Sequence, residues 1–146
     1  MVCVYCGGET QVTNSRSQKR SNQVWRRRQC KRCQAIFTSH EALELSSALF
    51  VQSGGSTKPF LPDKLYTEVL LALQDRPGCY SEARELTDTI TQKLLKSAEK
   101  PYLQPFQISK TAAEVLKRFN KRAWLRYAAE HPSLQGNNKR VRGLEG

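Results

Sequence analysis

The sequence predicts an α+β protein in which a small three-stranded domain, organised by cysteine pairs, precedes a domain made of a short β-hairpin and about four helices. Two observations predict this arrangement. Two Cys-x-x-Cys pairs, separated by residues 7–29, lie in a basic N-terminal segment. Beyond residue 47, apolar residues recur at helical spacing in four successive stretches. A chain of 146 residues, 38% apolar and 25% charged, has room for two such globular domains.

The first domain, predicted over residues 1–46, carries the most specific motif. Cys3, Cys6, Cys30 and Cys33 provide four thiolates that can surround one ion, which predicts a structural Zn²⁺ site without an open coordination position. A thioredoxin-like redox pair is the alternative, but it requires a single Cys-x-x-Cys at the start of a helix. His40 is a possible ligand that four sulfurs make unnecessary. Because so small a domain buries little surface, we expect zinc to supply its stability.

Three short strands are expected around the cysteine pairs, over residues 10–14, 23–29 and, with breaks, 35–45. A polar, basic loop is expected over residues 14–22. In the second strand, alternation with a period of two places Val24, Arg26 and Arg28 on one face and Trp25 and Arg27 on the other. A rigid strand of this kind displays its cations at fixed spacing.

The basic charge is concentrated in the first domain. The chain has a net charge of +11, and residues 1–40 contain eight lysines or arginines against the single acid Glu9. With so few acids nearby, the arginines are expected to lack internal counterions. A nucleic acid is therefore the predicted partner, since arginine pairs with phosphates and with guanine edges. A solvated charged face is the alternative. The predicted DNA-binding residues are Arg16, Arg26, Arg27, Arg28, Lys31 and Arg32.

The second domain is predicted over residues 47–132. Residues 48–53 and 56–61 flank a Gly-Gly pair that is typical of a two-residue hairpin turn, and Pro59 puts the second strand at a sheet edge or ends it. Four helices follow, the first after Asp63 and the others with Ser81, Ser109 and Asn120 as expected N-caps. Residues 133–146 are expected to form a basic flexible tail, and Cys79 has no predicted role.

Several function classes lack support in the sequence. The Gly-Gly-Ser-Thr-Lys run over residues 54–58 does not fit a phosphate-binding loop, because its order is wrong and Pro59 follows it. His40 and His131 have no nucleophile or paired carboxylate beside them, so no enzyme is predicted. The absence of a long apolar run or secretory signal predicts a cytoplasmic protein without membrane contact. A triphosphate could still lie against Lys58 and Lys64, near the first helix turn.

The order of these motifs resembles the bacterial NrdR family, transcriptional repressors of ribonucleotide reductase genes that join a zinc ribbon to an ATP-cone. The resemblance implies a cytoplasmic, nucleoid-associated homo-oligomer. By this resemblance, the ribbon is expected to bind short repeats in double-stranded DNA, and ATP or dATP bound to the cone is expected to set the oligomeric state. The matching segments are Cys3-x-x-Cys6, Asn14-Ser15-Arg16, residues 26–33, residues 37–41, Pro59-Phe60, Lys64-Leu65 and residues 115–129.

The cone departs from the family pattern. Residues 50–55 read Phe-Val-Gln-Ser-Gly-Gly where the family has Val-x-Lys-Arg-Asp-Gly, so the Lys-Arg pair expected to meet phosphate is absent. The resemblance leaves Gln52, Lys58 and Lys64 as the nucleotide-binding candidates. In the ribbon, Trp25 stands where another arginine is common and offers a ring for stacking.

Three alternative functions stay open at this point. One is a constitutive zinc-ribbon nucleic-acid binder whose cone no longer binds nucleotide. The second is an adaptor whose cone pairs with another protein, and the third is a ribbon that binds RNA.

Overall fold

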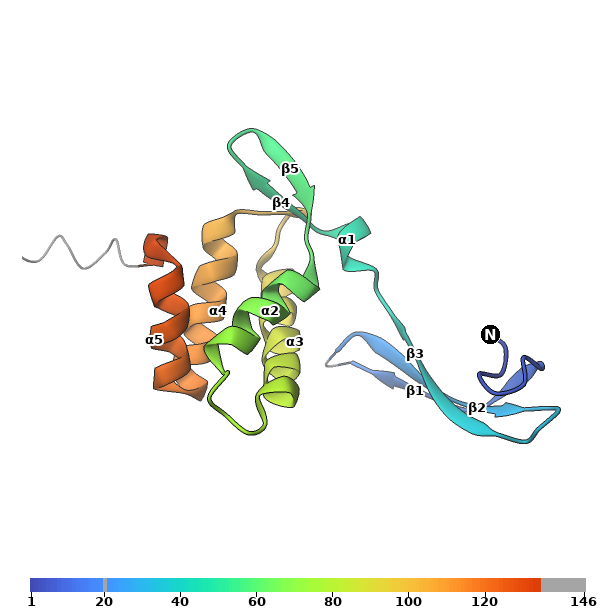
Figure 1. Cartoon of the computed structure of the whole chain (residues 1–146). Helices are drawn as coiled ribbons and strands as arrows, with labels where there is room; N and C mark the ends of the chain where they lie inside the picture. Colours follow the sequence, from blue (N-terminus) through green and yellow to red (C-terminus); the bar gives the residue numbers. More distant parts are fainter. Residues whose placement is uncertain (20, 135–146) are drawn as a thin grey trace, which may run out of the picture. The chain divides into compact units, whose positions relative to one another are not determined.

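The computed structural model describes residues 1–19 and 21–134, and the chain divides into two compact units, Met1–Glu44 and a second that begins at Leu45. Figure 1 shows a sheet in the first unit, and helices with a small hairpin in the second, which confirms the predicted α+β class. Most of the predicted tail over residues 133–146 lies outside the described residues. Its first two residues complete the short 3-10 helix η1, Pro132–Leu134. No helix in the described ranges is long and apolar enough to cross a membrane.

The first unit contains an antiparallel sheet of order β1-β2-β3, with bounds Thr10–Gln18, Gln23–Cys30 and Ile36–Ala42. The loop predicted over residues 14–22 is wrong for its first half, because β1 continues to Gln18 and pairs with β2 along its length. Polar side chains suit this exposed edge strand, and they gave no alternating pattern from which a strand could be predicted. A bulge between Val12 and Asn14 interrupts the register once.

A second small sheet opens the other unit. Strand β4 (Phe50–Ser53) pairs antiparallel with β5 (Ser56–Pro59) and parallel with the two-residue strand β6 (Tyr102–Leu103). The predicted hairpin is confirmed, and its two central glycines adopt φ values of +55° and +81°. Pro59 ends the edge strand, as predicted. Strand β6 and the short helix α1 (Leu45–Ala48) were not predicted from the sequence, since neither is long enough to show a period.

Four helices supply the core of this unit, and all four were expected. Their bounds are Pro62–Ala72 for α2, Cys79–Ser97 for α3, Pro105–Phe119 for α4 and Lys121–Glu130 for α5. Figure 1 shows the hairpin beyond one end of these helices. Apolar side chains of these helices form one core cluster with residues of the small sheet and its flanks. The largest fully buried side chains in the unit are Leu49, Val69, Leu73, Ile90, Leu94, Leu103 and Leu116.

Two of the expected helix caps are wrong. Ser81 lies inside α3, where its hydroxyl donates to the carbonyl of Gly78. Ser109 lies inside α4 and is buried, and its hydroxyl donates back to the carbonyl of Pro105. Proline begins this helix because its fixed φ suits the first helical position. The third cap is confirmed, since Asn120 Oδ1 accepts the N–H of Ala123 at 2.9 Å.

Candidate metal centre, basic ribbon and pocket

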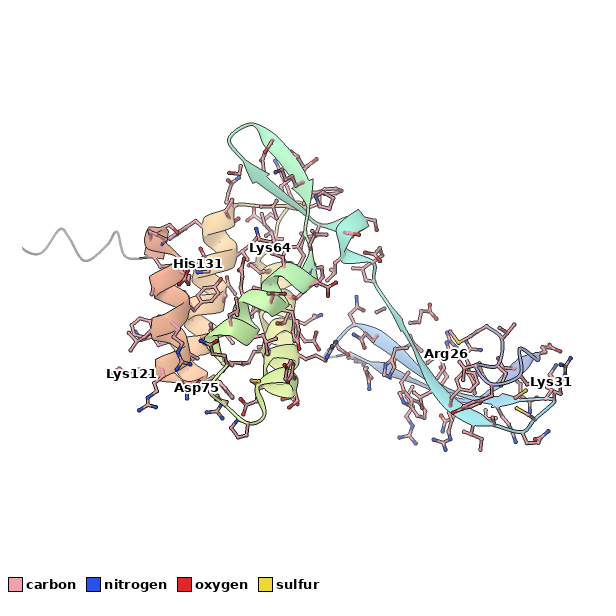
Figure 2. The ribbon with its side chains drawn as sticks, in the orientation of Figure 1. Arg26, Lys31, Lys64, Asp75, Lys121 and His131 are labelled. Carbon is pink, nitrogen blue, oxygen red and sulfur yellow. The ribbon has the colours of Figure 1, made fainter. Side chains whose placement is uncertain are left out.

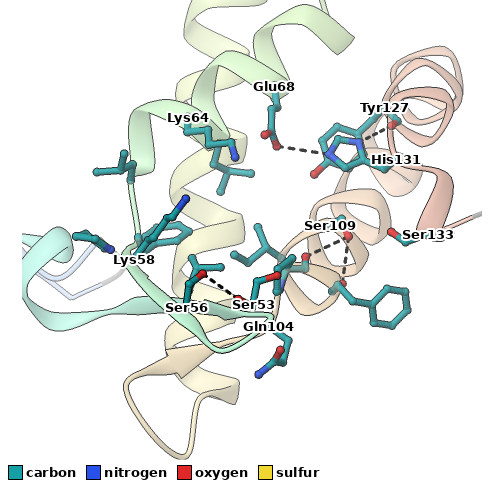
Figure 3. Close-up of a pocket in the computed structure, with 18 residues that line it drawn as sticks. Ser53, Ser56, Lys58, Lys64, Glu68, Gln104, Ser109, Tyr127, His131 and Ser133 are labelled. Atoms are coloured by element: carbon teal, nitrogen blue, oxygen red, sulfur yellow. Dashed lines mark hydrogen bonds and ion pairs between the residues drawn. The ribbon is translucent and has the colours of Figure 1, made fainter.

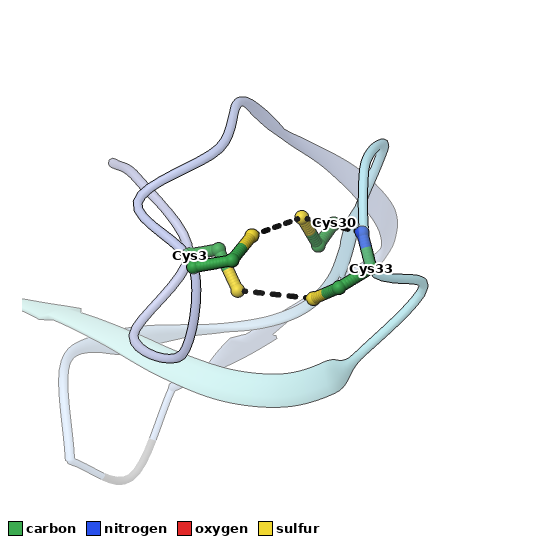
Figure 4. A group of neighbouring side chains, drawn as sticks. Cys3, Cys30 and Cys33 are labelled. Carbon is green, nitrogen blue, oxygen red and sulfur yellow. Dashed lines mark hydrogen bonds between the residues drawn. The ribbon is translucent and has the colours of Figure 1, made fainter.

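The four cysteines of the first unit converge on one point. Cys3 and Cys6 lie in the segment before β1, Cys30 ends β2, and Cys33 lies in the turn that follows. Figure 4 shows their sulfur atoms facing one another. All four lie within 4.8 Å of each other, with 3.6 Å between the sulfurs of Cys3 and Cys33 and 3.5 Å between those of Cys6 and Cys30. Tetrahedral Zn–S bonds of about 2.3 Å place sulfurs about 3.8 Å apart. The four cysteines are therefore positioned to hold a zinc ion.

Backbone groups support this cluster from both sides. The N–H groups of Arg32 and Cys33 point at the sulfur of Cys30, at 3.3 and 3.4 Å, and the N–H of Tyr5 points at the sulfur of Cys3. Gly7 turns the first pair with a φ of +68°. Gly8 lets the backbone pass close to the cluster, because a Cβ there would lie 3.1 Å from Arg32 Cβ and 3.3 Å from Cys6 Sγ.

The electrostatics of the sulfurs favour a bound cation. The N–H of Cys33, with that of Arg32, lowers the pKa of the Cys30 thiol to about 6 against the effect of burial. The N–H of Ala35 acts in the same direction on Cys33, but Cys6, burial and Cys3 outweigh it and raise the pKa of Cys33 to about 12. Four thiolates this close repel one another, and a divalent cation removes that repulsion.

The metal centre takes the place of a hydrophobic core in the first unit. Among its described residues, the buried ones are Cys3, Gly8 and Cys30, all at the sulfur cluster. Apart from Cys30 at the end of β2, the described residues of the sheet are exposed or partly buried. The expectation that zinc supplies the stability of this unit stays a prediction, and the small number of buried residues is consistent with it.

The six predicted DNA-binding residues do not form one surface. Arg26 and Arg28 share a face of β2, as the alternation predicted. Arg26 Nη2 lies 2.9 Å from Glu41 Oε2, and Arg28 Nε donates to Ser39 Oγ at 2.8 Å. The expectation that the cations lack internal counterions is wrong for Arg26, because antiparallel pairing brings Glu41 of β3 beside it. Figure 2 labels Arg26 on the sheet and Lys31 near the sulfur cluster.

The other cations fall into two groups. Arg16 and Arg27 lie on the opposite face, where the Arg16 guanidinium is 6.0 Å from the centre of the Trp25 ring. Lys31 and Arg32 lie in the turn between Cys30 and Cys33. Lys31 Nζ pairs with Glu9 Oε1 at 2.9 Å, so the expectation of absent counterions is wrong there too. Within residues 1–19 and 21–134, no carboxylate lies in ion-pair distance of Arg16, Arg27 or Arg32.

The second unit has a pocket of about 930 Å³ between the hairpin and three helices, drawn in Figure 3. Of the three nucleotide candidates, Lys58 on β5 and Lys64 in the first turn of α2 line it. Gln52 does not, because the alternation of β4 turns Val51 and Ser53 toward the pocket instead. The pocket therefore brings two of the predicted residues together.

Three further polar residues that line the pocket were not predicted from the sequence. They are Glu68 of α2, one turn beyond Lys64, Tyr127 of α5 and His131 just beyond α5. His131 stacks on the Tyr127 ring at 4.0 Å between centroids, and its Nε2 lies 3.6 Å from Glu68 Oε2. The Tyr127 hydroxyl is buried and finds no hydrogen-bond partner in the described part of the chain. Burial and the nearby Glu68 raise the pKa of Tyr127 well above its ordinary value. A sequence signal for these residues did exist. Lys64 and Glu68 are four residues apart, as are Tyr127 and His131, and this spacing places each pair on one side of its helix.

Comparisons with known proteins agree with this geometry. Residues 1–41 match a family model described as the N-terminal domain of NrdR-like transcriptional repressors. The transcriptional repressor NrdR of Sphingopyxis alaskensis is 35% identical over 88% of this chain and 83% of its own length. The proteins of that name from Herminiimonas arsenicoxydans and Symbiobacterium thermophilum are 33% and 32% identical, over 92% and 99% of this chain and 86% and 96% of their own lengths.

Proposed function

The chain belongs to the NrdR family of zinc-ribbon transcriptional repressors, and on this premise we propose that it represses ribonucleotide reductase genes in the bacterial cytoplasm. The observation that carries the proposal is the convergence of four sulfurs within 4.8 Å at the end of a basic ribbon. Neither the matched family model nor the relatives described above are named as enzymes, so repression by binding is proposed rather than catalysis.

The ribbon is proposed to bind double-stranded DNA through its cations. Arg16, Arg27 and Arg32 are free of carboxylate partners within the described ranges, so they can meet phosphates without first breaking an ion pair. Arg26 and Lys31 must exchange Glu41 and Glu9 for phosphate. The Nε of Arg28 donates to Ser39, and this bond orients the guanidinium, whose other N–H groups are proposed to contact a phosphate or a guanine edge.

Chelation of zinc tests this part directly. A chelator should abolish binding of a promoter duplex, and added Zn²⁺ should restore it. Duplex binding should also be measured in competition with single-stranded RNA, because displacement of the duplex by RNA would favour an RNA-binding ribbon. Binding that survives complete removal of the metal would contradict the proposal.

The pocket of the second unit is proposed to bind ATP or dATP. Its volume is within the range of ligand sites, and Lys58 and Lys64 supply positive charge for the phosphates. We assign the phosphates to these two lysines rather than to Gln52, which does not line the pocket. The buried Tyr127 hydroxyl and Glu68 offer further polar contacts in the pocket.

Nucleotide binding is proposed to act through the oligomeric state. A single ribbon offers few phosphate contacts, whereas an oligomer presents several ribbons to one DNA, and the effective concentration of the second ribbon then strengthens binding. The test is the oligomer size without nucleotide, with ATP and with dATP, measured for the wild type and for Lys58→Ala and Lys64→Ala. A size that never responds to nucleotide would leave a constitutive DNA-binding repressor or an adaptor.

A further inference from the structure

The two faces of the ribbon sheet differ in a way that duplex binding does not explain. On one face, Arg16, Trp25 and His40 are direct cross-strand partners in a single row over all three strands. Arg27 follows Trp25 on the same face, about 7 Å further along β2. We call these four residues the Trp25 face.

The packing of Trp25 differs from that of Trp124, the other tryptophan of the chain. The hydrophobic cluster formed by the described residues includes Trp124 at its margin but not Trp25. The ring is partly buried, its cross-strand partners are Arg16 and His40, and the Arg16 guanidinium lies 6.0 Å from its centre. An indole flanked by cations on an open sheet is the arrangement by which proteins stack nucleobases while holding the phosphates.

The two arginines of the Trp25 face are available for binding. Arg16 and Arg27 are exposed, and no described carboxylate pairs with either of them. On the opposite face, by contrast, Arg26 is neutralised by Glu41 and Arg28 is bonded to Ser39. The Trp25 face therefore displays an indole beside two exposed arginines without acidic partners, whereas the arginines of the opposite face are engaged and its aromatic residue, Phe37, is partly buried.

We propose that the Trp25 face binds single-stranded DNA, with a base stacked on the Trp25 indole and the adjoining phosphates on Arg16 and Arg27. In a duplex each base is covered by its neighbours, so an indole on a flat sheet meets a free base only where the strand is unpaired. This inference rests on the proposal that the ribbon binds nucleic acid, and it adds the form of nucleic acid and the residue that recognises it.

Fluorescence gives a direct test, because the chain has two tryptophans and the second can be removed conservatively. Trp124 is partly buried at the margin of the helical core, beneath Lys117, and Trp124→Phe leaves Trp25 as the reporter. Oligodeoxythymidylate added to this zinc-loaded variant should quench the Trp25 emission in parallel with binding. Inorganic polyphosphate, which has the charges but no bases, should compete for the site without quenching. Bound oligodeoxythymidylate without quenching, or equal quenching by polyphosphate, would overturn the stacking.

Variants separate the two nucleic-acid forms. Trp25→Ala should weaken oligodeoxythymidylate binding about tenfold, while Trp25→Phe keeps most of the affinity. Both should weaken duplex binding far less, because both keep Arg16 and Arg27, the residues of this face proposed to contact duplex phosphates. The control Val24→Ala, which changes an apolar side chain on the opposite face, should change neither affinity. Zinc content verifies folding of each variant, and the quenching experiment needs no change at Trp25.

The remaining outcomes each have one meaning. An equal loss of duplex affinity in Trp25→Ala would overturn the assignment to single strands, and tighter binding of oligouridylate than oligodeoxythymidylate would overturn the assignment to DNA. Wild-type protein that binds single strands but no duplex would instead contradict the proposed repressor mechanism and leave the Trp25 face standing.

Discussion

Gly8 offers the sharpest test of how the first unit holds its metal. Replacing Gly8 with Ala would place a Cβ 3.1 Å from Arg32 Cβ, 3.3 Å from Cys6 Sγ and 3.4 Å from Cys30 Sγ. Arg32 cannot withdraw freely, because its N–H is bonded to the Cys30 sulfur at 3.3 Å. The substitution therefore displaces either a ligand or the amide that supports it. Disturbing such supporting contacts weakens metal affinity about 10- to 100-fold.

The neighbouring Gly7 provides a matched control. A Cβ at Gly7 meets nothing within 4 Å, but its φ of +68° strains any side chain other than Asn or Asp. Gly7→Ala should therefore weaken zinc binding through backbone strain of about 1–2 kcal/mol, and Gly7→Asn should recover most of that loss. Gly8→Asn should recover nothing, because its defect is a lack of space. Competition for zinc with a chromogenic chelator measures all four variants. Wild-type affinity in Gly8→Ala would refute the reasoning.

Three further predictions concern the rest of the chain. Zinc chelation should unfold the first unit, so that the amides of β2 lose protection from hydrogen exchange while the amides of α3 stay protected. Equal loss of protection in both units would contradict the metal's role as a local core. Tyr127→Phe should leave the free energy of unfolding unchanged or raise it by about 1 kcal/mol, because the hydroxyl that it removes is buried without a hydrogen-bond partner in the described part of the chain. A clear loss of thermal stability would mean that the hydroxyl does make a hydrogen bond. Arg76 lowers the pKa of Glu82, so this ion pair should stabilise the second unit fully at pH values above the ordinary Glu pKa of 4.5. The stabilisation should be lost as the pH falls through the lowered pKa. Arg76→Met should flatten that part of the acid unfolding curve, and an unchanged curve would count against the ion pair.

The elements that were predicted correctly are those with a strong local pattern. The cysteine spacing located the sulfur cluster, the Gly-Gly pair located the hairpin, and the apolar periodicity located four helices. Asn120 was identifiable as a cap because its side chain bonds within its own turn. Each of these features is determined by residues close together in sequence.

The features that were missed depend on distant pairing. Residues 15–18 of β1 have no strand pattern of their own and become a strand because β2 pairs with them. Glu41 neutralises Arg26 only through the register of β2 with β3, and Lys31 meets Glu9 only because the two cysteine pairs converge. The pocket wall of Glu68, Tyr127 and His131 likewise joins α2 to the end of α5. No local sequence window contains these contacts.

The central claim is that a zinc-organised ribbon binds DNA through cations displayed on its sheet and turn. Its most direct test is the salt dependence of duplex binding by the zinc-loaded wild type and Arg27→Ala, whose guanidinium has no acidic partner among the described residues. We predict weaker binding and a slope of log affinity against log salt that is smaller by about one, with unchanged zinc content. An unchanged slope, together with unchanged affinity in Arg16→Ala and Arg32→Ala, would remove the ribbon from the DNA interface.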